Sequence, residues 1–244
     1  MSAPSQRLRQ RGVRRSPREN RLRNTAVTPR RYSPLQTTSL ARRSMRIIVI
    51  GATGTIGSAV AAQLERDHEV VRASRRGPIS VDMDDPASIE KLFATVPDVD
   101  AVICCAASGK LTDLDSDDDF YRGIQGKLFG QVELARTALR HLRDGGSVTL
   151  TSGVFERAQK GMSFGALVNA GLEAFVGAAA TEMSRGIRLN TVSPGWVAET
   201  LESMGLDGAD GTPARNVAAA YVEAVQGTRQ GQTLRPSRAG VLVV

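Results

Sequence analysis

The sequence predicts a single α/β domain built on a parallel, doubly wound sheet. From Met45 onward, short aliphatic runs alternate with stretches of helical periodicity, which is typical of repeated β-α-β units. The 244 residues suffice for one large domain of this class and are few for two. Residues 101–105 are apolar without interruption, as expected for a strand buried on both faces. We therefore expect about seven parallel strands with helices on both faces of the sheet.

The expected elements alternate along the chain, and turn residues separate them. Strands are expected at residues 46–50, 69–73, 79–81, 101–105, 147–151, 187–192 and 232–234. Helices are expected at residues 55–66, 86–95, 120 to about 141, 164–183 and 213–226. Pro86 suits a first helical turn. Gly145 and Gly146 end the long helix, and Pro194 with Gly195 stops the sixth strand.

The positive charge of the chain is concentrated at its N-terminus. Residues 1–44 contain twelve arginines and one acid, Glu19, so the net charge of this segment is +11. The net charge of the whole chain is +7, so residues 45–244 carry a net charge of −4. The segment lacks apolar periodicity, and we expect it to be disordered. Three interpretations stay open: a translation start at Met45, an organelle transit peptide, or a nucleic-acid-binding arm. The folded domain is expected at residues 45–236, followed by a short C-terminal tail at 237–244.

The sequence disfavours several other classes of function. No apolar run has transmembrane length and no secretory signal is apparent, so we expect no membrane partner and a cytoplasmic location, or an organelle if residues 1–44 are a transit peptide. Cys104 and Cys105 are adjacent in the sequence, so a disulfide bond between them would be strained. Their spacing also does not match that of metal-binding cysteines. We expect no metal, and nucleic acid is a disfavoured partner because the folded part is mildly acidic.

A glycine-rich turn follows the first expected strand and opens the first expected helix. Gly51, Gly54 and Gly57 allow a tight turn and a close approach of the backbone to a pyrophosphate, and the helix N-terminus offers free N–H groups. This context predicts a Rossmann fold that binds a dinucleotide. The predicted contacts in this turn are Gly51, Thr53, Gly54, Thr55, Ile56 and Gly57.

The end of the second strand distinguishes between nicotinamide cofactors. NAD-binding folds place a carboxylate there to bond the ribose 2′-hydroxyl. This chain has Ser74 and Arg75 instead, and no acid lies between residues 70 and 78. A guanidinium can bind a 2′-phosphate through two hydrogen bonds, so we predict NADP as the cofactor. Asp82, after the third strand, is expected to meet the adenine edge.

Taken together, the motifs resemble the short-chain dehydrogenase/reductase (SDR) family across residues 45–235. The matching segments are GATGTIG at 51–57, VDMDD at 81–85, DAVICCAAS at 100–108, GGSVTLTSG at 145–153 and RLNTVSPGWV at 188–197. The resemblance implies that the turn after strand six contacts the nicotinamide carboxamide, through Pro194, Gly195 and Val197. It also implies a cofactor contact at Ala106, and a homo-dimer or tetramer that forms through the long helix and the helix bearing the active site.

The resemblance fails at the catalytic residues. The family uses a Tyr as general acid/base, a Lys four residues later that lowers the Tyr pKa, a Ser and an Asn. Alignment places Gly165 at the Tyr position and Asn169 at the Lys position, and no YxxxK occurs in the chain. Lys127 fills the Asn position. For the Ser, strand register points to Gly153 and the spacing to the Tyr position points to Ser152.

Two functions are consistent with this sequence. In the first, the protein is an NADP-dependent oxidoreductase acting on a small carbonyl or alcohol, with Lys127 and Ser152 as hydrogen-bond donors to the substrate. In the second, it is an NADP(H)-binding sensor or scaffold without turnover, and Lys127 is a structural ion-pair partner. Trp196 is expected near the nicotinamide. Phe129, Val132 and Leu139 are expected to face either a partner subunit or the sheet.

Overall fold

The computed structural model describes residues 43–106, 111–116, 121 and 123–244. These residues form one compact unit around a single sheet, and the expected disorder of residues 1–44 lies almost entirely outside them.

The sheet contains eight strands in the order β3-β2-β1-β4-β5-β6-β7-β8. All neighbouring strands are parallel except the pair of β7 and β8. The strands are β1 (Arg46–Ile50), β2 (Glu69–Ser74), β3 (Ile79–Ser80), β4 (Ala101–Cys104), β5 (Ser147–Thr151), β6 (Arg188–Val192), β7 (Thr233–Ser237) and β8 (Gly240–Val243). The strand order reverses between β1 and β4, which confirms the doubly wound α/β fold and creates a crevice at the carboxyl ends of these strands.

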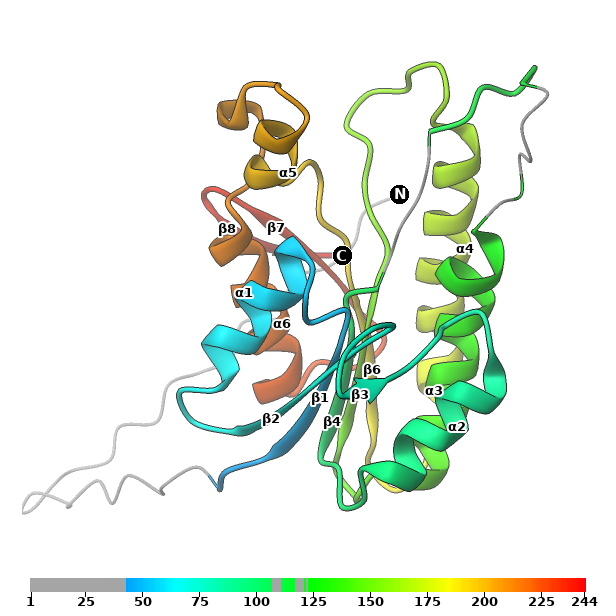
Figure 1. Cartoon of the computed structure of the whole chain (residues 1–244), viewed down its shortest axis with the longest axis vertical. Helices are drawn as coiled ribbons and strands as arrows, with labels where there is room; N and C mark the ends of the chain where they lie inside the picture. Colours follow the sequence, from blue (N-terminus) through cyan, green and yellow to red (C-terminus); the bar gives the residue numbers. More distant parts are fainter. Residues whose placement is uncertain (1–42, 107–110, 117–120, 122) are drawn as a thin grey trace, which may run out of the picture. The chain divides into compact units, whose positions relative to one another are not determined.

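Helices cover both faces of the sheet (Figure 1). One face carries α1 (Thr55–Leu64) and α6 (Ala214–Gln226), which pack against each other. The other face carries α2 (Pro86–Thr95), α3 (Gly130–His141) and α4 (Ser163–Ala179). Alternate residues of each buried strand contribute to opposite faces: Ile48 and Ile50 of β1 join the core under α2, α3 and α4, whereas Ile47 and Val49 join the core under α1 and α6.

The C-terminus differs from the sequence prediction. The expected short strand extends to Ser237, and the expected tail instead forms β8, which pairs antiparallel with β7. A tight turn joins the two strands, in which Gly240 has φ 141° and its carbonyl accepts a hydrogen bond from the Ser237 hydroxyl. Because β8 forms only by pairing with β7, its short apolar run gave no independent signal in the sequence.

The long helix and its neighbours also differ from the prediction. Instead of one helix from residue 120, a π-helical turn η1 (Gln125–Phe129) precedes α3, and residues 117–120 and 122 lie outside the described part. A short helix α5 (Ala198–Ser203) and 3₁₀ turns η2 (Ala180–Glu182) and η3 (Gly208–Asp210) were not expected. They are too short to generate a periodic apolar pattern.

One helical segment has the length and composition of a membrane span, contrary to the expectation from the sequence. It runs through α4 and η2, from Ser163 to Glu182. Leu172 and Val176 of this segment are buried in the hydrophobic core between the helix and the sheet. A core helix of this kind passes the same test of length and composition as a membrane span, so the finding alone does not indicate a membrane protein.

Candidate functional site

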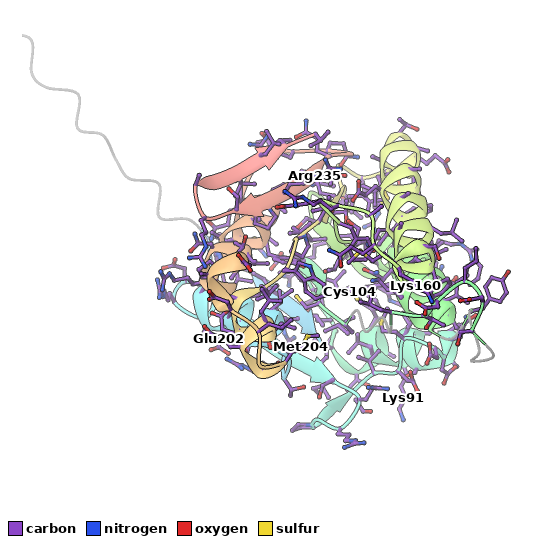
Figure 2. All side chains as sticks on the ribbon, turned by 90° about the horizontal axis from the view of Figure 1, so that it is seen from above. Lys91, Cys104, Lys160, Glu202, Met204 and Arg235 are labelled. Atoms are coloured by element: carbon purple, nitrogen blue, oxygen red, sulfur yellow. The ribbon has the colours of Figure 1, made fainter. Side chains whose placement is uncertain are left out.

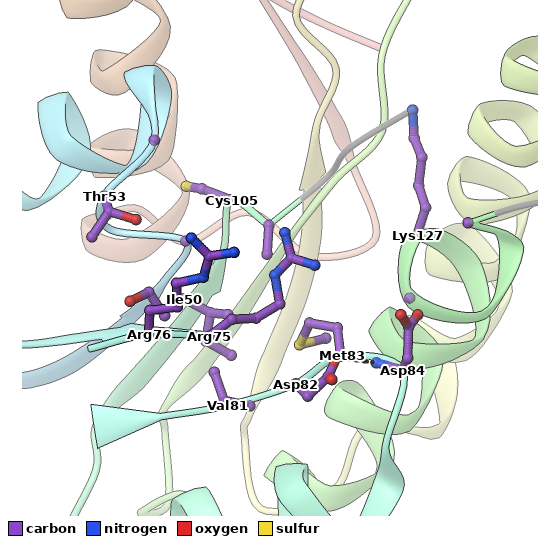
Figure 3. Close-up of a pocket in the computed structure, with 16 residues that line it drawn as sticks. Ile50, Thr53, Arg75, Arg76, Val81, Asp82, Met83, Asp84, Cys105 and Lys127 are labelled. Carbon is purple, nitrogen blue, oxygen red and sulfur yellow. Dashed lines mark hydrogen bonds between the residues drawn. The ribbon is translucent and has the colours of Figure 1, made fainter. Parts of the chain in front are cut away.

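A cavity of about 650 Å³ opens at the carboxyl ends of β1, β2 and β4 (Figure 3). It lies at the reversal of strand order, where doubly wound sheets bind ligands. Its lining consists of Ile50, Gly51, Thr53, Gly54, Ser74, Arg75, Arg76, Val81, Asp82, Met83, Asp84, Cys105, Ala106, Gly123, Gly126 and Lys127. The cavity therefore joins the glycine-rich turn, the end of β2 and the π-helical turn in one space.

The glycine-rich turn is sterically restricted to glycine at two positions. Gly51 has φ 79°, and a Cβ there would lie 2.7 Å from the backbone nitrogen of Ala106. A Cβ at Gly57 would lie 2.2 Å from the carbonyl oxygen of Gly51. Gly54 caps α1 without any side-chain hydrogen bond, so the first amides of this helix remain available to an anion. The close approach that the glycines allow and the free amides of α1 both suit the binding of a pyrophosphate at this turn.

The end of β2 supplies two cations to the cavity. The guanidinium groups of Arg75 and Arg76 both point into it (Figure 3). Neither arginine forms an ion pair with any acid in the described part of the chain. Ser74 lines the cavity beside them. An unneutralised pair of guanidiniums is suited to a phosphate, and Arg76 is a lining residue that the sequence prediction left out.

Across the cavity, acidic residues follow β3. Asp82 and Asp84 both line it, and one carboxylate oxygen of Asp82 accepts the backbone N–H of Asp84 at 3.1 Å. A Cβ at Gly130 would lie 2.0 Å from the backbone carbonyl oxygen of Met83, so only glycine lets the start of α3 approach this loop. Asp82 and Asp84 thus both lie at the cavity, and the contact of Asp82 with the adenine edge stays a prediction.

Lys127 lies on the π-helical turn and lines the cavity on the side away from Arg75 and Arg76 (Figure 3). Burial lowers the pKa of its ammonium. The alternative prediction was that Lys127 forms a structural ion pair. Within the part of the chain that the structure describes, no acidic residue forms an ion pair with Lys127. π-helical turns inside helices occur frequently at functional sites.

Gln131 fixes this turn to the sheet. Its side chain is fully buried and its Nε2 donates to the carbonyl of Lys127 at 2.7 Å and to the carbonyl of Thr151 at 2.9 Å. Its Oε1 accepts the backbone N–H of Thr151 at 2.8 Å. Gln131 therefore ties the backbone of Lys127 to the end of β5, next to Ser152. Gln131 was not predicted as a site residue, because its role depends on two segments 24 residues apart in the sequence that meet in space.

Ser152 does not line the cavity. It is 4% exposed, and its hydroxyl donates to Oε1 of Glu173 on α4 at 2.9 Å. The Ser193 hydroxyl donates to the same oxygen at 2.7 Å. Arg235, labelled in Figure 2, comes from β7 and places Nη2 3.2 Å from Oε2 of Glu173. A polar cluster thus joins the ends of three strands to α4, and only Ser152 of this cluster was singled out in the sequence.

The positions aligned with the family Tyr and Lys have well-defined neighbours. A Cβ at Gly165 would lie 3.0 Å from Cζ of Phe155, so the Phe155 ring occupies the space beside this glycine. Asn169 is 4% exposed, and its Oδ1 has no hydrogen-bond partner among the described residues. A Cβ at Gly153 would approach its Nδ2 to 3.1 Å. A bulky side chain at position 165 would therefore have to displace Phe155.

Cys104 and Tyr221 are buried, whereas the half-buried Cys105 lines the cavity. Burial raises the pKa of Cys104 to about 12 and also raises that of Cys105. Figure 2, viewed from above, shows Cys104 in the middle of the molecule, and its side chain is fully buried. The Tyr221 hydroxyl lies 2.6 Å from Oγ1 of Thr151, and burial raises its pKa. Tyr221 is inaccessible and cannot take the role of the missing family Tyr.

The remaining predicted cofactor contacts lie outside the cavity lining. Ile56 packs against the core beside α6, and Val197 is buried there. These two, together with Thr55, Gly57, Pro194 and Gly195, do not line the cavity, whereas Gly51, Thr53, Gly54, Ser74, Arg75, Asp82 and Ala106 do. Among the residues that the structure describes, no group of three or more metal-binding side chains is found.

The sheet, the glycine-rich turn and the cavity define a nucleotide-binding protein of the doubly wound α/β class. A family model described as enoyl-(acyl carrier protein) reductase matches residues 38–232. The chain belongs to the short-chain dehydrogenase/reductase family. A search among curated proteins gives no match.

Solved structures agree with this assignment. The protein lin1944 from Listeria innocua is 35% identical, with a TM-score of 0.74, and the match covers 79% of this chain and 99% of that one. A small-chain dehydrogenase in complex with NADPH is 28% identical, with a TM-score of 0.69 and coverage of 80% and 97%. A short chain dehydrogenase from Mycobacterium smegmatis is 22% identical, with a TM-score of 0.67 and coverage of 79% and 91%, and shares the fold.

Proposed function

We propose that this protein is an NADP(H)-dependent oxidoreductase that acts on a small carbonyl or alcohol through a modified catalytic site. The proposal rests mainly on one observation: Arg75 and Arg76 at one end and Lys127 at the other line the same cavity. The arginines suit a 2′-phosphate, and the glycine-rich turn suits a pyrophosphate. The relative in complex with NADPH supports this choice of cofactor.

The chain's own residues would bind, orient and polarise the reactants. When bound, the nicotinamide supplies or accepts the hydride. Lys127 would donate a hydrogen bond to the substrate oxygen, and its partial burial strengthens that interaction relative to water. Gln131 would hold Lys127 at a fixed distance from the end of β5. Pro194, Gly195, Val197 and Trp196 are proposed to lie toward the nicotinamide.

A specific observation favours a second candidate function, an NADP(H)-binding sensor or scaffold without turnover. Gly165 and Asn169 stand where the family has its Tyr and Lys, and Phe155 takes the space beside Gly165. Lys127 favours the enzyme, because a protein that only binds the nucleotide does not require a partly buried ammonium at the cavity that has no ion-pair partner among the described residues.

The experiment that separates these functions is a calorimetric NADPH titration followed by a screen of carbonyls and alcohols. An enzyme binds NADPH and turns over at least one compound, with turnover reduced by Lys127→Met. A sensor binds NADPH equally well and turns over none. Absence of both binding heat and quenching of Trp196 emission by NADPH would contradict both functions.

We further propose a homo-dimer or tetramer in a reducing compartment such as the cytoplasm. Leu167 on α4 is 58% exposed and Phe129 at the end of η1 is 51% exposed, which supports a partner surface there. Leu139 instead packs against the core. Light scattering of the wild type and of Leu167→Glu tests this, since an assembly through α4 should dissociate in the variant.

A further inference from the structure

The cluster around Glu173 holds a carboxylate that the proposed function leaves without a role. The Glu173 side chain is 21% exposed and receives hydroxyl hydrogen bonds from Ser152 and Ser193 on one oxygen. Its other oxygen faces Arg235 at 3.2 Å. Among the described residues, Arg235 is the charged group that contacts Glu173.

The direction of the Ser152 hydrogen bond limits what Ser152 can offer a ligand. A serine hydroxyl has one proton and two lone pairs, and an ionised carboxylate can only accept. The Ser152 proton is directed at Glu173, 2.9 Å away, so only the lone pairs of Oγ remain. A ligand that meets Ser152 must therefore donate a hydrogen bond. An alcohol can do so, and a carbonyl oxygen cannot.

Lys127 offers the opposite polarity. An ammonium can only donate, so a ligand oxygen that meets Lys127 must accept. Gln131 bonds to the backbone of both Lys127 and Thr151, which fixes Lys127 relative to the strand end that carries Ser152. Ser152 lies outside the cavity lining, so a ligand at Lys127 must extend toward the end of β5 to reach it. An alcohol oxygen has the polarity that both groups require, since it can accept from Lys127 and donate to Ser152. The hydrogen-bonding pattern therefore matches an alcohol substrate.

We propose that Glu173 is a positioning residue that makes Ser152 the proton acceptor of this site, in place of the absent Tyr and Lys. The O–H bond of the alcohol breaks as its proton moves to Oγ of Ser152. The original proton of Ser152 moves to Oε1 of Glu173, which becomes a neutral carboxylic acid. The inference rests on the proposed function, in which the same alcohol loses its hydride to the nicotinamide. In the reverse direction, Glu173 returns the proton through Ser152 to the product oxygen.

The first test is the pH profile of alcohol oxidation by the full chain carrying Glu173→Gln. A glutamine keeps the size of the side chain but has no basic oxygen to take the proton. We expect kcat/KM to fall by about 10²–10⁴-fold. The decline of wild-type kcat/KM at acidic pH should disappear in the variant, because the glutamine side chain has no carboxylate to take up a proton. Glu182→Gln, an exposed site on η2, is the matched control and should retain the wild-type profile.

The second test does not depend on turnover. With glutamate labelled by carbon-13 at its side-chain carboxyl carbon, the resonance missing from Glu173→Asp, which keeps a carboxylate at this position, identifies Glu173. In Ser152→Ala the carboxylate loses a donor, and its titration midpoint should move to higher pH. An unchanged midpoint would overturn the proposed coupling even if Glu173→Gln failed to fold.

The outcomes separate this inference from the proposed function. If the wild type oxidises an alcohol and Glu173→Gln keeps both its rate and its acidic decline, the inference is wrong and the function stands. If the wild type shows no NADPH binding and no turnover, the proposed function fails, and with it the proton transfer.

Discussion

The two ends of the cavity differ in how they depend on the rest of the molecule. At the phosphate end, the contacts come from two short continuous segments, the turn at 51–57 and the residues 74–76 that follow β2. The catalytic end combines Lys127, which lines the cavity, with the cluster around Ser152 and Glu173, which lies outside the cavity lining, and its side chains come from η1, α3, α4, β7 and the ends of β5 and β6. A local site tolerates change elsewhere in the fold, whereas an assembled site depends on every element that builds it.

The largest expected effect is at the phosphate end. Arg75→Ala together with Arg76→Ala removes two guanidiniums that no acid in the described chain neutralises. Two charge-assisted hydrogen bonds of about 1.5–3 kcal/mol each predict a loss of about 10²–10⁴-fold in NADPH affinity. Calorimetry should show a much smaller change for NADH, which lacks the 2′-phosphate. Equal losses for the two cofactors would exclude a 2′-phosphate site.

Lys127→Met tests the catalytic end and should affect turnover without affecting NADPH affinity. Loss of one hydrogen-bond donor to a developing charge predicts a decrease in kcat of about 10²–10³-fold. The ammonium acts as a donor only when protonated, and burial lowers its pKa from the ordinary value of 10.5. Wild-type activity should therefore be present at lower pH and lost as the pH rises through this lowered pKa. Lys127→Arg should move the loss to higher pH, and a profile unchanged in Lys127→Arg would rule Lys127 out as the titrating group.

Gln131→Leu should weaken the catalytic end through the backbone. The substitution leaves the N–H of Thr151 without its partner in a buried position, at a cost of about 1–3 kcal/mol. Chemical denaturation should show this loss of unfolding free energy, and the KM for NADPH should stay close to that of the wild type. A variant with lower stability and unchanged kcat would show that Gln131 supports only the fold. Gln159→Leu, at an exposed position in the segment between β5 and α4, serves as the control.

The smallest expected effect is that of Gly165→Ala. The added methyl would lie 3.0 Å from Cζ of Phe155, and the ring must shift to accommodate it. We expect a loss of less than about 1.5 kcal/mol in stability, which Phe155→Leu should relieve in the double variant. If the two substitutions give additive losses in denaturation experiments, the ring does not occupy the space beside position 165.

The fold and the phosphate end could be predicted because both rest on local patterns. Gly51 and Gly57 lie where only glycine fits, and the strand before them and the helix after them have clear periodicity. Arg75 was predicted from the absence of a carboxylate at the end of β2, and it lines the cavity. Arg76 was not singled out because a solvated turn residue and a cavity residue look alike in a sequence.

The catalytic end could be predicted only in part. Lys127 was identified by alignment, and it lines the cavity. Ser152 was identified too, but nothing local shows that its hydroxyl is bonded to a glutamate 21 residues later. Glu173 and Arg235 are 62 residues apart, and each alone is consistent with a solvated surface charge.

The sequence by itself determined the class of fold, the glycine-rich turn and the absence of a YxxxK motif, since each depends on residues that are near one another along the chain. Only the tertiary structure decided that the π-helical turn brings Lys127 to the cavity, that Phe155 lies beside Gly165, and that the last residues form β8. It also decided that one carboxylate connects β5, β6, β7 and α4. The physical reason is that packing and buried hydrogen bonds join segments whose sequence separation leaves no periodic trace.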